Sequence, residues 1–130
     1  MSWQTFLAIG IGGFIGAVLR AYLNGLISHK FSSATATIPY GTLGVNLLGS
    51  FFMGVLFSYF MSSSLSIHFK SFLSTGILGA LTTYSTFAIE SFLLLNGGHL
   101  FLAFSNMALN MFGTILMAGS GYYLTTNFIK

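Results

Sequence analysis

The sequence predicts an all-α membrane protein with four transmembrane helices, and three observations lead to that fold class. Hydrophobic residues make up 55% of the 130 residues, charged residues only 4%, and the mean hydropathy is +0.88, whereas about a quarter of an ordinary soluble domain is charged. A bilayer core of about 30 Å needs roughly 20 apolar residues per helix, so we expect residues 1–130 to form a single four-helix transmembrane domain. No ten-residue window alternates polar with apolar residues, which disfavours a β-barrel.

The spans are placed between the stretches where polar and turn-forming residues gather. We expect the four helices to cover Trp3–Ser28, Tyr40–Met61, Phe69–Leu95 and His99–Asn127. The first apolar run begins next to Met1 without a basic leader, so we expect a membrane span there and not a removable signal peptide. Pro39 suits the entrance of the second helix, and Asn96–Gly98 suits a tight turn between the last two.

The basic residues give almost no instruction about orientation. With four spans, Lys70 and Lys130 lie on one side of the membrane, and Lys30 lies on the other side, joined by Arg20 if its side chain reaches that interface. Orientation follows the imbalance of Lys and Arg between short loops, and here that imbalance is nearly zero. We therefore expect dual topology and an antiparallel homodimer; the alternative is that a partner or the insertion machinery sets the orientation. The net charge of +3 comes from scattered residues and is too small and too dispersed to form a nucleic-acid-binding surface.

The glycines of the first span predict close helix packing. Gly12 and Gly16 form a GxxxG motif, with Gly10 and Gly13 nearby, and small residues allow helices to approach one another in lipid. The spacing of a dinucleotide-binding GxGxxG loop fails because Ile15 interrupts it. A subunit with four helices has little interior for a solute path, so we expect these glycines to serve oligomerisation.

Polar residues inside two spans recur at every fourth position, which places them on one helical face. The two stripes are Thr42, Asn46 and Ser50 in the second span and Asn106, Asn110 and Thr114 in the fourth. Polar side chains are costly in hydrocarbon and face a protein interior or a water-filled path. The stripes therefore predict either the lining of a solute path or interhelical hydrogen bonds, which contribute about 0.6 kcal/mol each in membranes.

The third span contains the segment GALTTYSTFAIE (Gly79–Glu90), in which five hydroxyl residues are consecutive. Hydroxyl side chains bond back to helix carbonyls, and carbonyls freed at membrane depth are tolerated where they bind a cation or line a cavity. We expect a broken helix within Gly79–Thr86. Tyr84 and Phe87 share a face, where the positive edges of their rings suit an anion; ordinary packing is the alternative.

Three ordered motifs in this sequence resemble those of the Fluc (CrcB-like) fluoride channels. They are GGFIGAVLR (Gly12–Arg20), GTLGVNLLGSFFMG (Gly41–Gly54), and GILGALTTYSTF (Gly76–Phe87) followed by Glu90. The resemblance covers essentially the whole chain. It implies a dual-topology antiparallel dimer in the plasma membrane, with two pores that pass fluoride passively out of the cell.

The resemblance also assigns roles to individual residues. It implies a central sodium ion held by the backbone carbonyls of Gly79 and Thr82, and it places Arg20 and Glu90 toward the vestibules. With the polar stripes and the hydroxyl cluster, it gives a fluoride path formed by Asn46, Thr83, Tyr84, Ser85, Phe87, Asn110 and Thr114.

One position departs from the pattern of the family. The family usually has phenylalanine where this chain has Tyr84. A phenol oxygen adds a hydrogen-bond donor at the ring edge, so we expect Tyr84 to affect conduction or selectivity more than the fold.

Two other functions are compatible with a small membrane chain, and an enzyme is not among them. The sequence has no nucleophile and base pair, and His29, His68 and His99 lie near span ends without metal-ligand spacing. A proton-coupled multidrug exporter would rely on Glu90 as the only membrane carboxylate, although the first span lacks the glutamate such exporters use. In a non-conducting packing subunit, the glycines and stripes would serve assembly alone.

Overall fold

The computed structural model describes residues 1–129, and every regular element within that range is helical. The elements in chain order are α1 (Trp3–Lys30), α2 (Tyr40–Ser62), α3 (Ile67–Ser71), the π-helical segment η1 (Phe72–Leu78), α4 (Gly79–Leu81), α5 (Tyr84–Asn96) and α6 (Leu100–Ile129). Lys130, which entered the comparison of basic residues, lies outside the described residues.

Four helical stretches are long and apolar enough to cross a membrane, which confirms the predicted all-helical class and number of spans. They are α1, α2, the run from α3 to α5 (Ile67–Asn96), and α6, with mean hydropathies of 1.8, 1.6, 1.4 and 1.6. The helices extend slightly beyond the predicted bounds, since α1 continues to Lys30 and α6 to Ile129.

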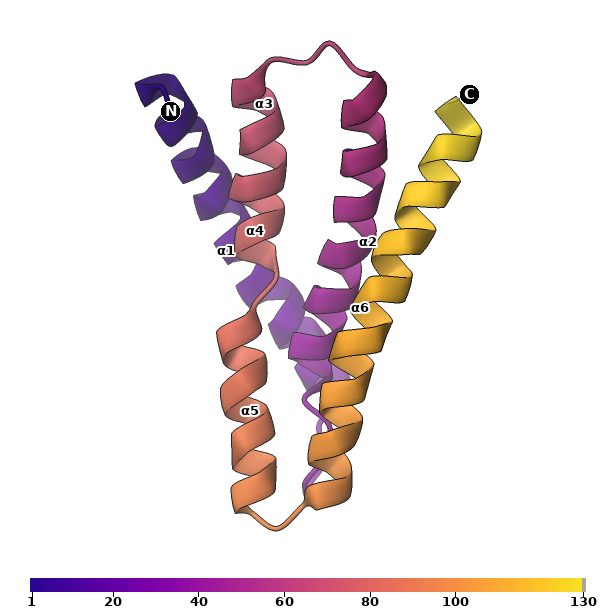
Figure 1. Cartoon of the computed structure of the whole chain (residues 1–130). Helices are drawn as coiled ribbons and strands as arrows, with labels where there is room; N and C mark the ends of the chain where they lie inside the picture. The colour runs from indigo at the N-terminus through magenta and orange to yellow at the C-terminus, as the bar shows by residue number, and fades with distance from the viewer. Residues whose placement is uncertain (130) are drawn as a thin grey trace.

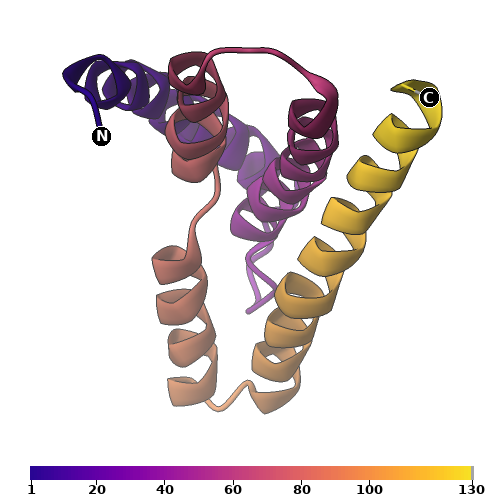
Figure 2. The same ribbon diagram turned by 45° about the horizontal axis from the view of Figure 1, so that its top comes forward.

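The chain runs back and forth along one long direction (Figure 1). Both termini and the α2–α3 connection lie at one end, and the α5–α6 turn lies at the other. The tilted view shows α1 passing behind the other helices, while α5 and α6 descend together to their short turn (Figure 2).

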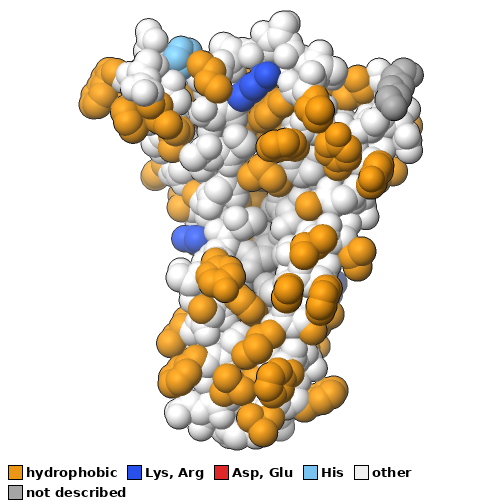
Figure 3. Space-filling view, in the orientation of Figure 1, with side chains coloured by type: hydrophobic (Ala, Val, Ile, Leu, Met, Phe, Trp, Pro, Cys, Tyr) orange, Lys and Arg blue, Asp and Glu red, His pale blue; other side chains and the backbone are white. Residues whose placement is uncertain are grey.

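The subunit is apolar on the outside and largely polar within. Apolar side chains spread over the whole height of the face seen in Figure 3, which shows few basic and no acidic side chains. The buried apolar residues are few, whereas more polar side chains are buried, among them Thr42, Asn46, Asn106 and Asn110. This inversion is expected where lipid covers the exterior and the interior must satisfy hydrogen bonds.

The most extensive helix packing is between α2 and α6, and glycines on both helices permit it. A Cβ atom at Gly54 would overlap with the carbonyl oxygen of Ala118, and one at Gly121 would overlap with that of Phe51. Ser58 and Thr126 add a hydrogen bond of 2.8 Å between the same helices. The pair is therefore held by backbone contact and side-chain bonding, as is usual for helices in lipid.

The glycine motif of α1 packs within the subunit, which corrects the expectation that it serves oligomerisation. A Cβ atom at Gly12 would overlap with the carbonyl oxygen of Phe72, and one at Gly16 with that of Ile77. Both glycines are buried against η1, because the third span of the same chain occupies this face. Gly10 and Gly13 have no neighbour in the described chain that a Cβ atom would meet.

The third span leaves α-helical geometry near its middle. After η1 and the single turn of α4, Thr82 (φ −84°, ψ 156°) and Thr83 (φ −148°, ψ 118°) are extended, and α5 begins at Tyr84. The hydroxyl of Thr83 accepts a hydrogen bond of 3.3 Å from the backbone N–H of Thr86, which caps the new helix. We call Thr82 and Thr83 the extended segment.

The connections follow from their turn residues, as the sequence predicts. Pro39 precedes α2, and its carbonyl accepts a 3.1 Å bond from Leu43 N–H. Between α5 and α6, Gly98 has φ +80°, a left-handed conformation that favours glycine.

Candidate functional site

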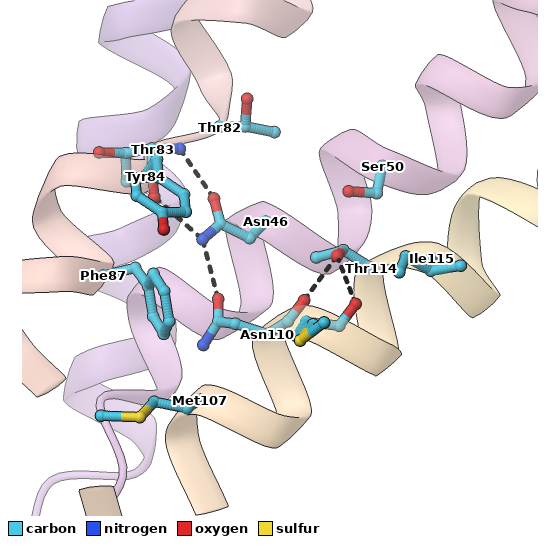
Figure 4. A pocket seen from close by; sticks show the side chains of 11 residues that line it. Asn46, Ser50, Thr82, Thr83, Tyr84, Phe87, Met107, Asn110, Thr114 and Ile115 are labelled. Carbon is cyan, nitrogen blue, oxygen red and sulfur yellow. Dashed lines mark hydrogen bonds between the residues drawn. The ribbon is translucent and has the colours of Figure 1, made fainter. Parts of the chain in front are cut away.

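A cleft of about 580 Å³ lies beside the extended segment, between α2, α5 and α6 (Figure 4). Its lining combines amides, hydroxyls, two aromatic rings and an apolar wall. The lining residues are Asn46, Ser50, Thr82, Thr83, Tyr84, Phe87, Met107, Asn110, Met111, Thr114 and Ile115. None of these side chains carries a formal charge, so any ion in the cleft would meet dipoles alone.

Asn46 binds both backbone groups of Thr83. Its Oδ1 accepts from Thr83 N–H at 2.8 Å, and its Nδ2 donates to the Thr83 carbonyl at 3.1 Å. In a continuous helix these groups would bind other backbone groups, so the asparagine replaces the partners that the extended conformation removes. Asn46 is 7% exposed, and an unpaired backbone group at that depth would cost free energy.

A chain of side-chain amides continues from Asn46 across the subunit. Its Nδ2 also donates to Asn110 Oδ1 at 2.9 Å, and Asn110 Nδ2 donates to the Oδ1 and backbone carbonyl of Asn106, each at 3.0 Å. Asn106 in turn donates to the Ser91 hydroxyl at 3.0 Å. The chain joins α2, α6 and α5, so it fixes three helices around the extended segment.

The hydroxyls around the cleft divide into engaged and free groups. Thr114 donates to the Asn110 carbonyl at 2.5 Å, and Thr82 donates to the Leu78 carbonyl at 3.1 Å. The hydroxyls of Ser50 and Tyr84 have no hydrogen-bond partner within residues 1–129. They are therefore the donors of the cleft that remain open to a ligand.

The predicted aromatic pair lies together at the cleft. The ring centroids of Tyr84 and Phe87 are 5.5 Å apart at an interplanar angle of 67°, an edge-to-face arrangement. Both rings line the cleft (Figure 4), and Tyr84 is 81% exposed in the isolated subunit. Ring edges and a phenol hydroxyl are thus available at the open side of the cleft.

Four of the predicted site residues lie outside the cleft lining: Gly79, Ser85, Arg20 and Glu90. Ser85 is exposed next to Tyr84. Arg20 is half-buried, and its Nη1 donates at 3.5 Å to the carbonyl of Thr82, in the middle of the third span. Glu90 is also half-buried; its Oε1 accepts from the Thr42 hydroxyl at 2.8 Å, and its buried Oε2 has no partner in the described chain.

The backbone carbonyls predicted to hold a cation are released by the extended segment. The N–H of Thr83, which would bind the Gly79 carbonyl in a continuous helix, goes to Asn46 instead. The N–H of Thr86 goes to the Thr83 hydroxyl, which leaves the Thr82 carbonyl to Arg20. No cluster of His, Cys, Asp and Glu that could hold a metal occurs among residues 1–129.

Sequence reasoning placed Ser50 in the polar stripe of the second span, one turn beyond Asn46 on the same face, but did not include it in the fluoride path. It missed the apolar wall formed by Met107, Met111 and Ile115. The wall repeats every four residues, one position after the polar stripe of α6. An apolar repeat in a membrane helix is indistinguishable from a lipid-facing row without the fold.

Comparison with known proteins agrees with the sequence motifs. Residues 7–122 match the family described as CrcB-like protein, Camphor Resistance (CrcB). The chain is 71% identical over 125 residues to the fluoride-specific ion channel FluC of Sulfurimonas denitrificans, and the alignment covers 95% of each chain. It is 46% identical to that of Nautilia profundicola over 94% of each chain, and 44% identical to that of Campylobacter fetus over 95%.

Proposed function

The chain belongs to the CrcB-like family, and from this membership we propose that it is a fluoride-specific ion channel of the plasma membrane, through which fluoride leaves the cell passively. The main support for this proposal is the 71% sequence identity to a fluoride-specific ion channel over 95% of both chains. The chain is a multi-pass membrane protein with four spans, and its function is transport and not catalysis.

The chemistry of the cleft supports a path for a small anion. Fluoride is strongly hydrated, so a pore must replace its water with donors and still let it leave. The free hydroxyls of Ser50 and Tyr84 and the ring edges of Tyr84 and Phe87 supply such contacts without a fixed charge. Asn46, Thr83, Asn110 and Thr114 complete the path that we propose; Ser85, outside the lining, stays a prediction.

We propose further that two subunits form an antiparallel homodimer of dual topology. The exposed ring of Tyr84 and the open side of the cleft support this, since a partner would cover both. Arg20 donates to the Thr82 carbonyl in the middle of the third span. Lys30 and Lys70 remain at opposite ends of the described helices, so the basic residues set no direction of insertion.

A sodium ion at the dimer centre fits the donor set. The extended segment frees the carbonyls of Gly79 and Thr82 from helical partners, and carbonyl oxygens are the hard ligands that such a cation prefers. Arg20 donates to the Thr82 carbonyl at 3.5 Å, so sodium would share that oxygen with Arg20 or displace its bond. One subunit supplies only these two, so a second copy would be needed to surround the ion. When bound, sodium would supply positive potential near the path without a basic side chain in it.

The two rival functions have less support. A multidrug exporter would need Glu90 to exchange protons with a substrate path, yet Glu90 bonds to Thr42 and does not line the cleft. A packing subunit would explain the glycine contacts but not the free donors of the cleft, and the similar proteins are fluoride channels.

Growth of a fluoride-sensitive bacterium that lacks its own exporter tests the proposed function. Expression of this chain should restore growth in medium with raised fluoride, whereas the empty vector should not. Equal growth inhibition with and without the chain, at confirmed expression in the membrane, would contradict the proposal.

A further inference from the structure

In the cleft, one amide hydrogen of Asn46 that could bind an anion is already used in a hydrogen bond within the protein. Asn46 Nδ2 donates at 2.9 Å to Asn110 Oδ1, from α2 to α6, and both residues line the cleft. Figure 4 shows this bond among the lining side chains, with the ring of Phe87 nearby. The two hydrogens of Asn46 are thus divided between the Thr83 carbonyl and Asn110.

The orientation of both amides follows from the backbone. Thr83 N–H requires an oxygen and the Thr83 carbonyl requires a donor, so Asn46 has only one orientation that satisfies both. Its second hydrogen must then meet an acceptor, which fixes Asn110 with Oδ1 toward Asn46. The polar stripe of α6 therefore presents an acceptor to the cleft at this point and not a donor.

Asn106 keeps Asn110 in that orientation. The amino group of Asn110 donates to two oxygens of Asn106, which is 0% exposed. Rotation of the Asn110 amide by half a turn would place its amino group against that of Asn46 and break these bonds. Asn110 therefore does not offer its own hydrogens to an anion without the loss of several bonds.

We propose that Asn110 sets the affinity for fluoride by competing with it for one hydrogen of Asn46; the inference rests on the proposed function. When fluoride enters, it accepts this hydrogen, and the Asn110 oxygen, still held in place by the bonds to Asn106, accepts from water in the cleft instead. When fluoride leaves, the bond between the two asparagines forms again. The competition weakens fluoride binding by about fivefold, the factor expected for one hydrogen bond, and so favours release.

Calorimetric titration of sodium fluoride into the purified full chain in detergent tests this inference. Asn110→Ala removes the competing acceptor, and the fluoride dissociation constant should fall about fivefold. Asn110→Val serves as a second variant, because valine is close in size to asparagine, cannot accept a hydrogen bond and keeps the helices packed. Ser120→Ala is the matched control: Ser120 lies on α6, is exposed, and bonds only to the Leu116 carbonyl, so its dissociation constant should equal that of the unaltered chain.

A dissociation constant that rises or stays the same in Asn110→Ala and Asn110→Val overturns the inference. A rise would show that Asn110 donates to fluoride, and no change would show that it takes no part. A different result would contradict the proposed function: the unaltered chain would then neither bind fluoride nor conduct it.

Discussion

Asn46 and Thr83 are joined by two hydrogen bonds, one to each backbone group of Thr83, at 2.8 and 3.1 Å. This relationship connects the polar stripe of α2 to the interruption of the third span. An extended residue in the middle of a membrane helix lacks helical partners for its backbone, and lipid supplies none. The asparagine provides both partners from a neighbouring helix, so the interruption and the cleft depend on the same side chain.

Asn46→Asp should reduce fluoride flux at least about tenfold. The carboxylate still accepts from Thr83 N–H, but it has no hydrogen to donate to the Thr83 carbonyl or to fluoride, and each such bond contributes about 1 kcal/mol. Fluoride efflux from liposomes measures the effect. Ser58→Ala removes a hydrogen bond from the same helix far from the cleft and should keep normal flux; equal flux in both variants would contradict the role of Asn46.

Tyr84→Phe should leave the stability of the subunit fold unchanged within about 0.5 kcal/mol, because the phenol is exposed in the isolated subunit and has no partner in the described chain. The fluoride dissociation constant should rise, since one free donor is lost, and the rate at saturating fluoride should rise with it. Tyr123→Phe, at an exposed tyrosine of α6, is the control. If the fluoride dissociation constant of Tyr84→Phe equals that of the unaltered chain, the phenol does not contact fluoride.

Gly121→Ala should destabilise the subunit by about 1–3 kcal/mol, because the added methyl group overlaps with the backbone of α2. Gly119→Ala is a matched control on the same helix, since a Cβ atom at Gly119 meets no atom within 4 Å. Thermal unfolding in detergent compares the two. Equal midpoints would mean that α2 and α6 do not pack through these glycines.

Removal of sodium should lower the thermal midpoint of the proposed dimer. A ligand that binds only the assembled state stabilises it by about 2.7 kcal/mol at one hundred times its dissociation constant. The measurement replaces sodium chloride with N-methylglucamine chloride at equal ionic strength. A midpoint that is independent of the cation would contradict a sodium site formed by the carbonyls of Gly79 and Thr82.

The four spans and their connections were predictable from the sequence. Apolar length defines the helices, and the glycine at φ +80° and the proline before α2 act through local backbone preferences that do not depend on the rest of the fold. Asn46 and Asn110 each belong to a stripe of polar residues at every fourth position, so the sequence also placed each of them on a polar helical face. The two polar faces meet at the cleft.

The partners of these residues were not predictable in the same way. Spacing indicates that Gly12 and Gly16 favour a close helix, but not that this helix is η1 of the same chain. It also indicates that Asn46 carries donors, but not that Thr83 and Asn110 already accept them. Both facts depend on which helices become neighbours, and one sequence contains no direct signal for that.

Fluoride efflux from liposomes that contain the purified chain, read with a fluoride electrode, is the most direct test of fluoride-specific conduction. Chloride efflux from matched liposomes and protein-free liposomes are the controls. We expect rapid loss of fluoride without loss of chloride, and a much slower loss with Asn46→Asp. A folded protein that releases no fluoride, or that releases chloride equally fast, would contradict a fluoride-specific channel.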